Sequence, residues 1–225
     1  MWCVPAITTE FVTRMEDILR LYAKPENAKE PVVCLDERPV QLLAPERAGL
    51  PMKPGKVGRY DYEYVRHGTA NVFCIVEPLT GRRQTHATKT RTGLKFAHAL
   101  KRIATRHRKA RTIHLVLDNL STHTSKGLKA AYGERAGAKL WSRFTVHYTP
   151  KHASWLNAAE MEVSLVSREC LGTRRISELP VLQREVSAWN SRADRQRRAI
   201  RWRFRVNDAR RVFRYSGIAT ARSKH

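Results

Sequence analysis

Three acidic residues stand where a folded domain could gather them at one point. Asp36 follows the apolar run "VVCL", Asp118 follows "IHLVL", and Glu160 comes early in "SWLNAAEMEVSLVSRECL". The two apolar runs are typical of buried strands, and a strand end holds a side chain rigidly at the rim of a sheet. A plainer interpretation of Asp118 is that Asp-Asn supplies favourable turn chemistry where a strand ends.

Carboxylates gathered at one point repel one another unless a cation lies between them, and hard oxygen ligands suit Mg²⁺ or Mn²⁺. Two such ions can hold the attacking and leaving oxygens of a phosphodiester. Glu37 points to the opposite face of its strand from Asp36, which favours a supporting role. Glu160 and Glu162 lie about 200° apart around a helix, so only one can face the metals, and spacing alone does not choose between them.

The composition indicates an anionic partner. The 225 residues contain 43 Lys or Arg and 20 Asp or Glu, and residues 192–225 hold twelve basic residues against two Asp. Nucleic acid is the commonest partner of such a surplus, although an arginine-rich genome would leave a similar signature. Four dispersed cysteines and the lack of a long apolar run argue against a zinc site, a disulfide framework and a membrane span, and favour a cytoplasmic, nucleoid-associated protein.

The periodicity predicts a mixed α/β domain in which antiparallel strands come first. An exposed Gly- and Pro-rich loop is expected over 45–64, and Ser154 is a candidate N-cap. Strands are expected over 31–43, 71–77, 82–88, 113–117 and 144–149. Helices are expected over 10–23, 91–108, 124–136, 154–171, 178–192 and 206–214. If the first and fourth strands are neighbours, Asp36 and Asp118 lie at adjacent strand ends, and Glu160 projects from a helix packed over them.

Four motifs then carry a resemblance. In order and spacing, "VVCLDERPVQLL", "YEYVRHGTANVF", "IHLVLDNLSTHT" and "HYTPKHASWLNAAEMEVS" resemble the catalytic domain of DDE transposases of the bacterial insertion-sequence 630 family, relatives of the mariner elements. The resemblance covers roughly residues 2–215. It implies an RNase H-like fold, a five-stranded mixed sheet flanked by helices, and metal ligands at Asp36, Asp118 and Glu160. It thereby favours Glu160 over Glu162.

The resemblance also implies an activity and partners. These are metal-dependent cleavage and strand transfer of double-stranded DNA at the inverted repeats of an insertion sequence, a homodimer on DNA, and a TA target. Family members carry an N-terminal helix-turn-helix region, which needs at least two helices, whereas one helix is expected before the first strand here. We therefore expect either a second frame of a two-frame element, with a helix-turn-helix polypeptide from the upstream frame as its partner, or a decayed remnant with an internal start. The alternatives are a DNA-binding remnant that co-assembles with intact transposase, and a non-transposing RNase H-like nuclease.

The expected organisation is a helix and linker over 1–30, the catalytic domain over 31–175 and a basic helical extension over 176–225. The remaining candidates are residues that support the ligands or contact DNA. They are Asn119, His123, His67, Asn157, Arg201, Arg203 and Arg205. A structural hydrogen-bonding role is as well supported for His123 as a catalytic one, and metal binding by His147 and His152 is the weaker interpretation. In "RAIRWRFRV" the arginines and aromatic rings either grip DNA or form a solvated flank of the domain. Trp155 and Leu156 are expected to anchor their helix in the core.

Overall fold

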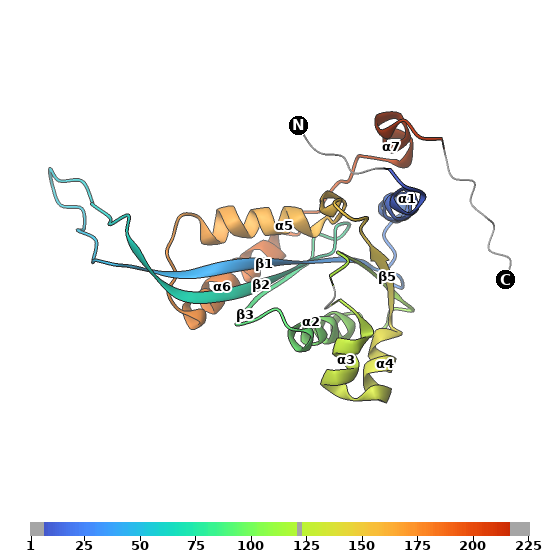
Figure 1. Cartoon of the computed structure of the whole chain (residues 1–225), viewed down its shortest axis with the longest axis horizontal. Coiled ribbons are helices and arrows are strands. Elements are labelled where there is room, and N and C mark those ends of the chain that lie inside the picture. Colours follow the sequence, from blue (N-terminus) through green and yellow to red (C-terminus); the bar gives the residue numbers. More distant parts are fainter. Residues whose placement is uncertain (1–6, 121–122, 217–225) are drawn as a thin grey trace.

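The protein is built on one five-stranded mixed sheet, seen in a computed structural model that describes residues 7–120 and 123–216 (Figure 1). The strands lie in the order β3-β2-β1-β4-β5. They are β1 (Val32–Pro45), β2 (Tyr64–Val76), β3 (Arg83–Thr88), β4 (Ile113–Leu117) and β5 (Phe144–Tyr148). The first three strands are antiparallel neighbours, whereas β4 pairs in parallel with both β1 and β5. The predicted α/β fold and the predicted contact between the first and fourth strands are therefore confirmed.

Strands β1 and β2 are longer than the sequence pattern predicts. β1 pairs with β4 only over Val32–Cys34 and then continues with β2 as a two-stranded ribbon that leaves the body of the molecule (Figure 1). Asp36 therefore lies within β1 rather than at its end, just beyond the last pair with β4. The strand itself was expected over 31–43, but placing Asp36 at its end was wrong, because the polar residues after Asp36 continue the strand by pairing with β2.

A register shift interrupts the ribbon opposite Leu42, where β2 contains His67 and Gly68. Gly68 has φ +98°, a conformation that glycine adopts without steric cost, as expected at a β-bulge. Leu42 is buried, whereas His67 is exposed on the ribbon. His67 is seven residues from Cys74, which pairs with Asp36, so roughly 20 Å of strand separates it from that carboxylate. The structure does not bring His67 to the candidate site.

One face of the sheet is covered by α2 (Gly93–Arg106), α3 (Ser125–Tyr132) and α4 (Glu134–Trp141). Helix α2 buries an apolar stripe at helical spacing, with Phe96, Leu100 and Ile103 fully buried. The single helix predicted over 124–136 is wrong. Gly133, with φ +83°, ends α3 and starts α4 in a conformation that other residues rarely adopt, so the chain turns there into an antiparallel helix pair.

The other face carries α1 (Thr9–Ala23), α5 (Ala159–Leu165), α6 (Leu179–Gln196) and α7 (Val206–Phe213). Helix α5 continues into a π-helical turn over Val166–Leu171, and a 3₁₀ turn over Ser154–Leu156 precedes it. The single helix predicted over 154–171, with Ser154 as its N-cap, is therefore wrong. The Ser154 side chain caps no helix, and the chain makes an extended step at Asn157 before α5 begins.

The segment between α6 and α7 alternates inward aromatic residues with outward arginines. Trp202 packs on Tyr22, with ring centroids 5.0 Å apart, and Phe204 packs edge-on against Trp155 at 5.6 Å. The arginines of this segment, Arg201, Arg203 and Arg205, are exposed. The two rings therefore contribute to packing between the ends of the chain rather than standing free to stack on a base. Leu156 is buried as predicted, whereas Trp155 remains 38% exposed. Within the described ranges, no helix combines the length and apolar character needed to cross a bilayer.

His86 on β3 makes the stability of the fold sensitive to acid. It stacks on Phe73 at 5.3 Å, and burial, assisted by the charge of Arg102, lowers its pKa to about 4. A histidine with a lowered folded-state pKa adds stability above its unfolded value of 6.5, and that stability is lost as the pH falls from 6.5 toward 4. Because of this residue, we expect the free energy of unfolding to drop by about 1 kcal/mol between pH 7.5 and 5.5.

Urea unfolding of the His86→Phe variant at the two pH values measures this effect. The variant should lose correspondingly less stability on acidification, whereas a matched change at the exposed His98, His98→Gln, should leave the acid sensitivity in place. An unchanged pH dependence in His86→Phe would contradict the assignment.

Candidate active site

Asp36 lies in an environment that disfavours its charge. Burial raises its pKa to about 7 against the hydrogen bond that the Glu37 backbone N–H donates to Oδ1 at 2.7 Å, and the charges of Glu160 and Asp118 raise it further. The carboxylates of Asp118 and Glu160, far from Asp36 in the sequence, therefore both lie close enough to repel its charge. A cation among them would relieve this repulsion.

Asp118 directly follows β4 and is paired with a histidine. The Nδ1 atom of His123 lies 2.6 Å from Asp118 Oδ1, and Nε2 lies 3.4 Å from Oε1 of Glu37. Burial lowers the pKa of His123, but the hydrogen bonds and charges of Asp118 and Glu37 outweigh it and raise the pKa to about 9. The ring stacks on Phe96 at 4.6 Å, so its orientation is fixed by packing as well as by charge. His123 is thus a buried cation between two acids at neutral pH.

Glu160 lies in the first turn of α5, and Asn157 ties that turn to β1. The side-chain amide of Asn157 donates to Leu35 O at 2.8 Å, and its Oδ1 accepts from the Ala159 N–H at 3.1 Å. One buried amide therefore connects the backbone beside Asp36 with the backbone beside Glu160. This arrangement explains why an Asn three residues before the glutamate is useful to the site.

Tyr22 of α1 holds the same turn from its other side. Its hydroxyl donates to Leu156 O at 2.9 Å and accepts from the Ala158 N–H at 3.1 Å. Trp202 packs on the Tyr22 ring, so the N-terminal helix and the segment after α6 both support the approach to α5.

Glu162 points away from this cluster. It is fully buried, and its Oε2 accepts a hydrogen bond from Arg83 Nε at 2.9 Å. Burial raises the pKa of Glu162, and the charge of Arg83 opposes that shift. The structure thus directs Glu162 to Arg83 and brings the charge of Glu160 to Asp36, a choice that helical spacing left open.

The other predicted candidates are scattered. Asn119 is exposed next to Asp118. His147 lies 2.6 Å from an Asp17 oxygen through Nδ1 and 2.9 Å from His114 Nδ1 through Nε2, which ties β5 to α1 and β4. His152 is exposed in a loop at φ +62° and is not part of that chain of contacts.

The donor set fits a hard divalent cation in chemistry, because the carboxylates of Asp36, Asp118 and Glu160 offer oxygen ligands that suit Mg²⁺ or Mn²⁺. As they stand, no three His, Cys, Asp or Glu side chains over residues 7–120 and 123–216 converge as ligands of one ion. Asp118 is turned toward His123 instead. The described side chains therefore do not form a ready-made ligand set.

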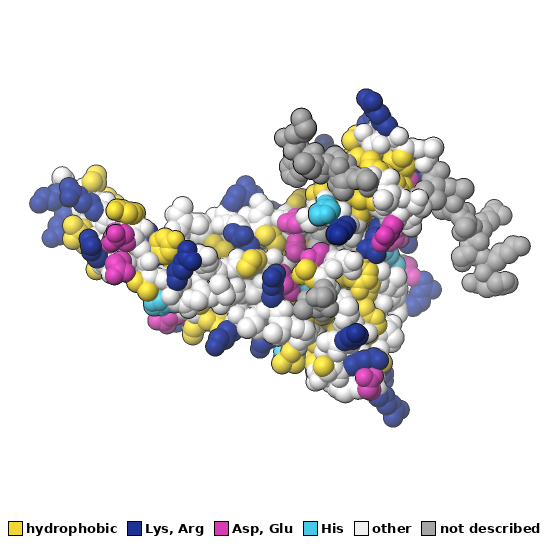
Figure 2. All heavy atoms as spheres, viewed as in Figure 1, with side chains coloured by type: hydrophobic (Ala, Val, Ile, Leu, Met, Phe, Trp, Pro, Cys, Tyr) yellow, Lys and Arg dark blue, Asp and Glu magenta, His cyan; other side chains and the backbone are white. Residues whose placement is uncertain are grey.

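The surface around the site is mixed in charge. Figure 2 shows acidic side chains gathered near the middle of one face, while basic side chains are spread along the ribbon and over the rest of that face. This pattern, a few acids within a basic surface, suits a protein that holds a polyanion around a cation-binding centre.

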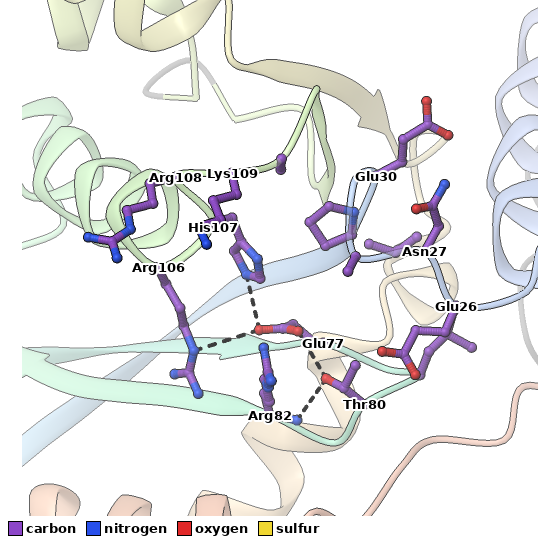
Figure 3. Close-up of a pocket in the computed structure, with 15 residues that line it drawn as sticks. Glu26, Asn27, Glu30, Glu77, Thr80, Arg82, Arg106, His107, Arg108 and Lys109 are labelled. Carbon is purple, nitrogen blue, oxygen red and sulfur yellow. Dashed lines mark hydrogen bonds and ion pairs between the residues drawn. The ribbon is translucent and has the colours of Figure 1, made fainter.

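A cavity of about 340 Å³ lies elsewhere, at the edge of the sheet where β1 begins (Figure 3). Its floor contains the buried Glu77, whose Oε1 lies 3.1 Å from His107 Nε2 and whose Oε2 accepts from Thr80 at 2.9 Å. Burial would raise the pKa of Glu77, but His107, Thr80 and Arg106 more than compensate and lower it. Glu77 is therefore already paired. The cavity is separate from Asp36, Asp118 and Glu160, because none of these three lines it.

Together, a five-stranded mixed sheet in this order and acids on β1, after β4 and on α5 agree with the class of RNase H-like endonucleases. The model of the DDE superfamily endonuclease family matches residues 31–183, and the chain belongs to that family. The resemblance drawn from the motifs is confirmed at this level. A search of curated protein sequences found no match.

Solved structures of the Mos1 mariner transposase share the fold. The Mos1 paired-end complex with Mn has a TM-score of 0.53 at 13% identity over 87% of this chain and 62% of that chain. The Mos1 paired-end complex with Mg has a TM-score of 0.53 at 14% identity over 88% of this chain and 59% of that chain. A pre-cleavage Mos1 transpososome has a TM-score of 0.53 at 13% identity over 85% of this chain and 58% of that chain. The chain thus spans about three fifths of the Mos1 chains. The predicted RNase H-like fold is confirmed.

Sequence reasoning missed the residues that hold the site from behind, chiefly Arg83 and Tyr22. Arg83 stands next to Arg82 in a strand of a very basic chain, and Tyr22 occupies one position of an apolar helical stripe. Neither has a local signal, because each acts on a partner at least 79 positions away.

The Asn157→Ala variant tests the connection between β1 and α5. It removes two buried hydrogen bonds, so we expect the free energy of unfolding to fall by about 2 kcal/mol. Asn71→Ala is the matched control. Asn71 is equally buried, but its side-chain atoms have no hydrogen-bond partner among the described residues, so the same truncation should cost clearly less. Equal losses in the two variants, measured by urea unfolding, would argue against a special role for Asn157.

Proposed function

We propose that this chain is the catalytic domain of a transposase that performs metal-dependent DNA strand cleavage and strand transfer during transposition of an insertion sequence. The observation that carries the proposal is that the charges of Glu160 and Asp118 both reach Asp36, whose pKa is raised by burial first and by these two charges in addition. Membership of the DDE superfamily endonuclease family supports it. We assign the catalytic domain to residues 31–175, with 1–30 and 176–225 as its flanking parts.

In this proposal Asp36, Asp118 and Glu160 hold two Mg²⁺ or Mn²⁺ ions. When bound, these ions supply Lewis acidity to the attacking and leaving oxygens of the phosphodiester. His123 keeps the Asp118 carboxylate oriented at the strand end, and Glu37 fixes the other side of the imidazole. Asn157 keeps the first turn of α5 in register with β1. Asn119, exposed beside Asp118, is a candidate DNA contact.

The proposed partner is double-stranded DNA that carries the inverted repeats of the element, with TA as target. The Mos1 structures are described as paired-end complexes and a transpososome, which supports binding of transposon ends by a protein of this fold. We assign the chain to the insertion-sequence 630 family. We further propose a homodimer on DNA, associated with the bacterial nucleoid, and a helix-turn-helix polypeptide from an upstream frame that reads the repeats. About two fifths of the Mos1 chains lie outside the region matched here, which leaves room for such a reader.

The first test is cleavage of a labelled duplex carrying the element's ends, with Mg²⁺ or Mn²⁺. The Asp36→Asn, Asp118→Asn and Glu160→Gln variants should each lose about a hundredfold or more of the nicking rate, because a carboxylate ligand is removed. DNA binding measured without metal should remain. No cleavage by the wild-type chain, with DNA binding intact, would favour instead a regulator that co-assembles with complete transposase. Nicking without strand transfer would indicate a simple nuclease.

The exposed arginines of the segment after α6 give a second test. Replacing Arg201, Arg203 and Arg205 with Gln should reduce the slope of log affinity against log salt by about 2 to 3, because each phosphate contact releases counterions. The control is the triple change of Lys126, Arg135 and Lys139 to Gln, which removes the same charge from exposed positions on α3 and α4. Fluorescence anisotropy over a salt series measures both. The hypothesis fails if the two triple variants have equal slopes.

A further inference from the structure

The most completely buried ion pair near the candidate site lies behind α5. Only 1% of the Arg83 side chain and none of the Glu162 side chain is exposed, and the Nε–Oε2 distance is 2.9 Å. Replacing a buried pair of this kind by apolar residues is often neutral for stability, so its presence indicates a demand for defined geometry. The acid of this pair, Glu162, lies two residues after Glu160 on α5.

The guanidinium of Arg83 is held in place on all sides. Nη1 donates to Gly81 O at 2.5 Å and Nη2 to Arg198 O at 2.9 Å, while the Arg83 backbone N–H donates to Asp194 Oδ1 at 2.7 Å. A planar fork with each nitrogen occupied has a single orientation. Arg83 is therefore a fixed point to which α5 can be attached.

Gly81 makes this arrangement possible. It has φ +67°, and a Cβ atom there would lie 2.5 Å from the Arg197 backbone. The β2–β3 turn and the chain after α6 can therefore approach closely enough to offer two carbonyl groups to one guanidinium. Because several elements meet at Arg83, a movement of α5 at Glu162 would disturb all of them.

The attachment at Glu162 decides how α5 is rotated. Two helical residues apart, Glu160 and Glu162 project about 200° from each other, so fixing Glu162 on Arg83 sends Glu160 to the opposite side of the helix. The first turn of α5, which carries Glu160, is tied by Asn157 to the β1 backbone beside Asp36. Glu162 Oε1 is buried without a hydrogen-bond partner in the part of the chain that the structure describes, so Arg83 provides the charge compensation.

We propose that Arg83 is a positioning residue for the metal site: through Glu162 it sets the rotation of α5 so that Glu160, and not Glu162, joins Asp36 and Asp118. The inference rests on the proposed function and deepens it. It implies that the second glutamate of the "EME" sequence serves as an anchor. Removing the anchor should loosen the metal site although every ligand remains.

Direct Mn²⁺ binding, measured by the EPR signal of free Mn²⁺, tests the inference without relying on activity. The double variant Arg83→Met/Glu162→Met removes the pair without leaving a lone buried charge. We expect it to fold, as judged by circular dichroism, and to bind Mn²⁺ about tenfold or more weakly than wild type. Cleavage by the double variant should fall in parallel and recover partly at high Mn²⁺.

The matched control is Arg143→Met. Arg143 also uses its guanidinium to bind two carbonyl groups, those of His107 at 2.8 Å and Ala110 at 3.4 Å, but at the far edge of the sheet. Its Mn²⁺ affinity should stay within about twofold of wild type even if its melting temperature falls. Wild-type affinity in the folded Arg83→Met/Glu162→Met protein would overturn the inference.

A second pair of variants separates anchor from ligand. Glu162→Gln keeps an oxygen for Arg83 and should bind Mn²⁺ within about twofold of wild type, whereas Glu160→Gln should bind about tenfold or more weakly. A large loss in Glu162→Gln would show that Glu162 is itself a ligand and would overturn the inference. Should the double methionine variant fail to fold, Arg83→Lys decides in its place. Lysine cannot hold three acceptors in the same geometry, so unchanged Mn²⁺ binding would count against Arg83.

The proposed function can fail separately. Equal Mn²⁺ binding by the wild-type chain and Asp118→Asn would show that the carboxylates are not the metal site, and both proposals would fall. Weaker binding by Asp118→Asn together with wild-type binding by Arg83→Met/Glu162→Met would leave the function standing and remove only the role of Arg83.

Discussion

Mutual repulsion of three carboxylates is the constraint around which this domain is organised. Asp36 and Asp118 come together because β1 and β4 pair in parallel over a few residues and then part, which leaves the two acids at the same edge. Glu160 joins them from a helix that crosses that edge. Asp36 lies where a negative charge is disfavoured: burial raises its pKa to about 7, and the charges of Glu160 and Asp118 raise it further. The surrounding structure must therefore hold the acids in place, and it does so with buried polar groups rather than with apolar packing alone.

Two buried cations divide this task. His123 lies between Asp118 and Glu37 on the α2 side of the sheet, and Arg83 binds Glu162 on the α6 side. His123 compensates Asp118 and also Glu37, which follows Asp36, while Arg83 compensates Glu162, two residues after Glu160. Neither cation pairs with Asp36 or Glu160. The positive charge missing from the centre is what a divalent ion would supply. Asn157 and Tyr22 add neutral hydrogen bonds that fix the backbone between these points.

The spacing of apolar residues was sufficient to predict the strands of the central sheet and helices α1, α2 and α6, because their buried faces repeat at strand or helix periods. It was not sufficient where backbone conformation depends on a distant partner. The end of α3 at Gly133 and the extended residue Asn157 before α5 have no periodic apolar pattern in the sequence. The first half of β2, from Tyr64, lies in the exposed ribbon and was expected to belong to a loop and to an unassigned segment. The acids themselves were found from type and spacing together with the family resemblance. Helical spacing alone could not choose between Glu160 and Glu162, because the contact that distinguishes them, from Arg83 to Glu162, spans 79 residues of sequence.

The contact between Tyr22 and Trp202 has a consequence for how much of the chain the site requires. Both residues lie outside the segment 31–183 that the family shares, yet together they support the turn that leads into α5. The part of this chain that a well-ordered site requires is therefore longer than the segment that matches the family model, residues 31–183. A deletion at either flank could retain all three acids and still leave one of them without a fixed place. Loss of flanking sequence, and not only loss of an acid, is thus a route by which this domain would be inactivated.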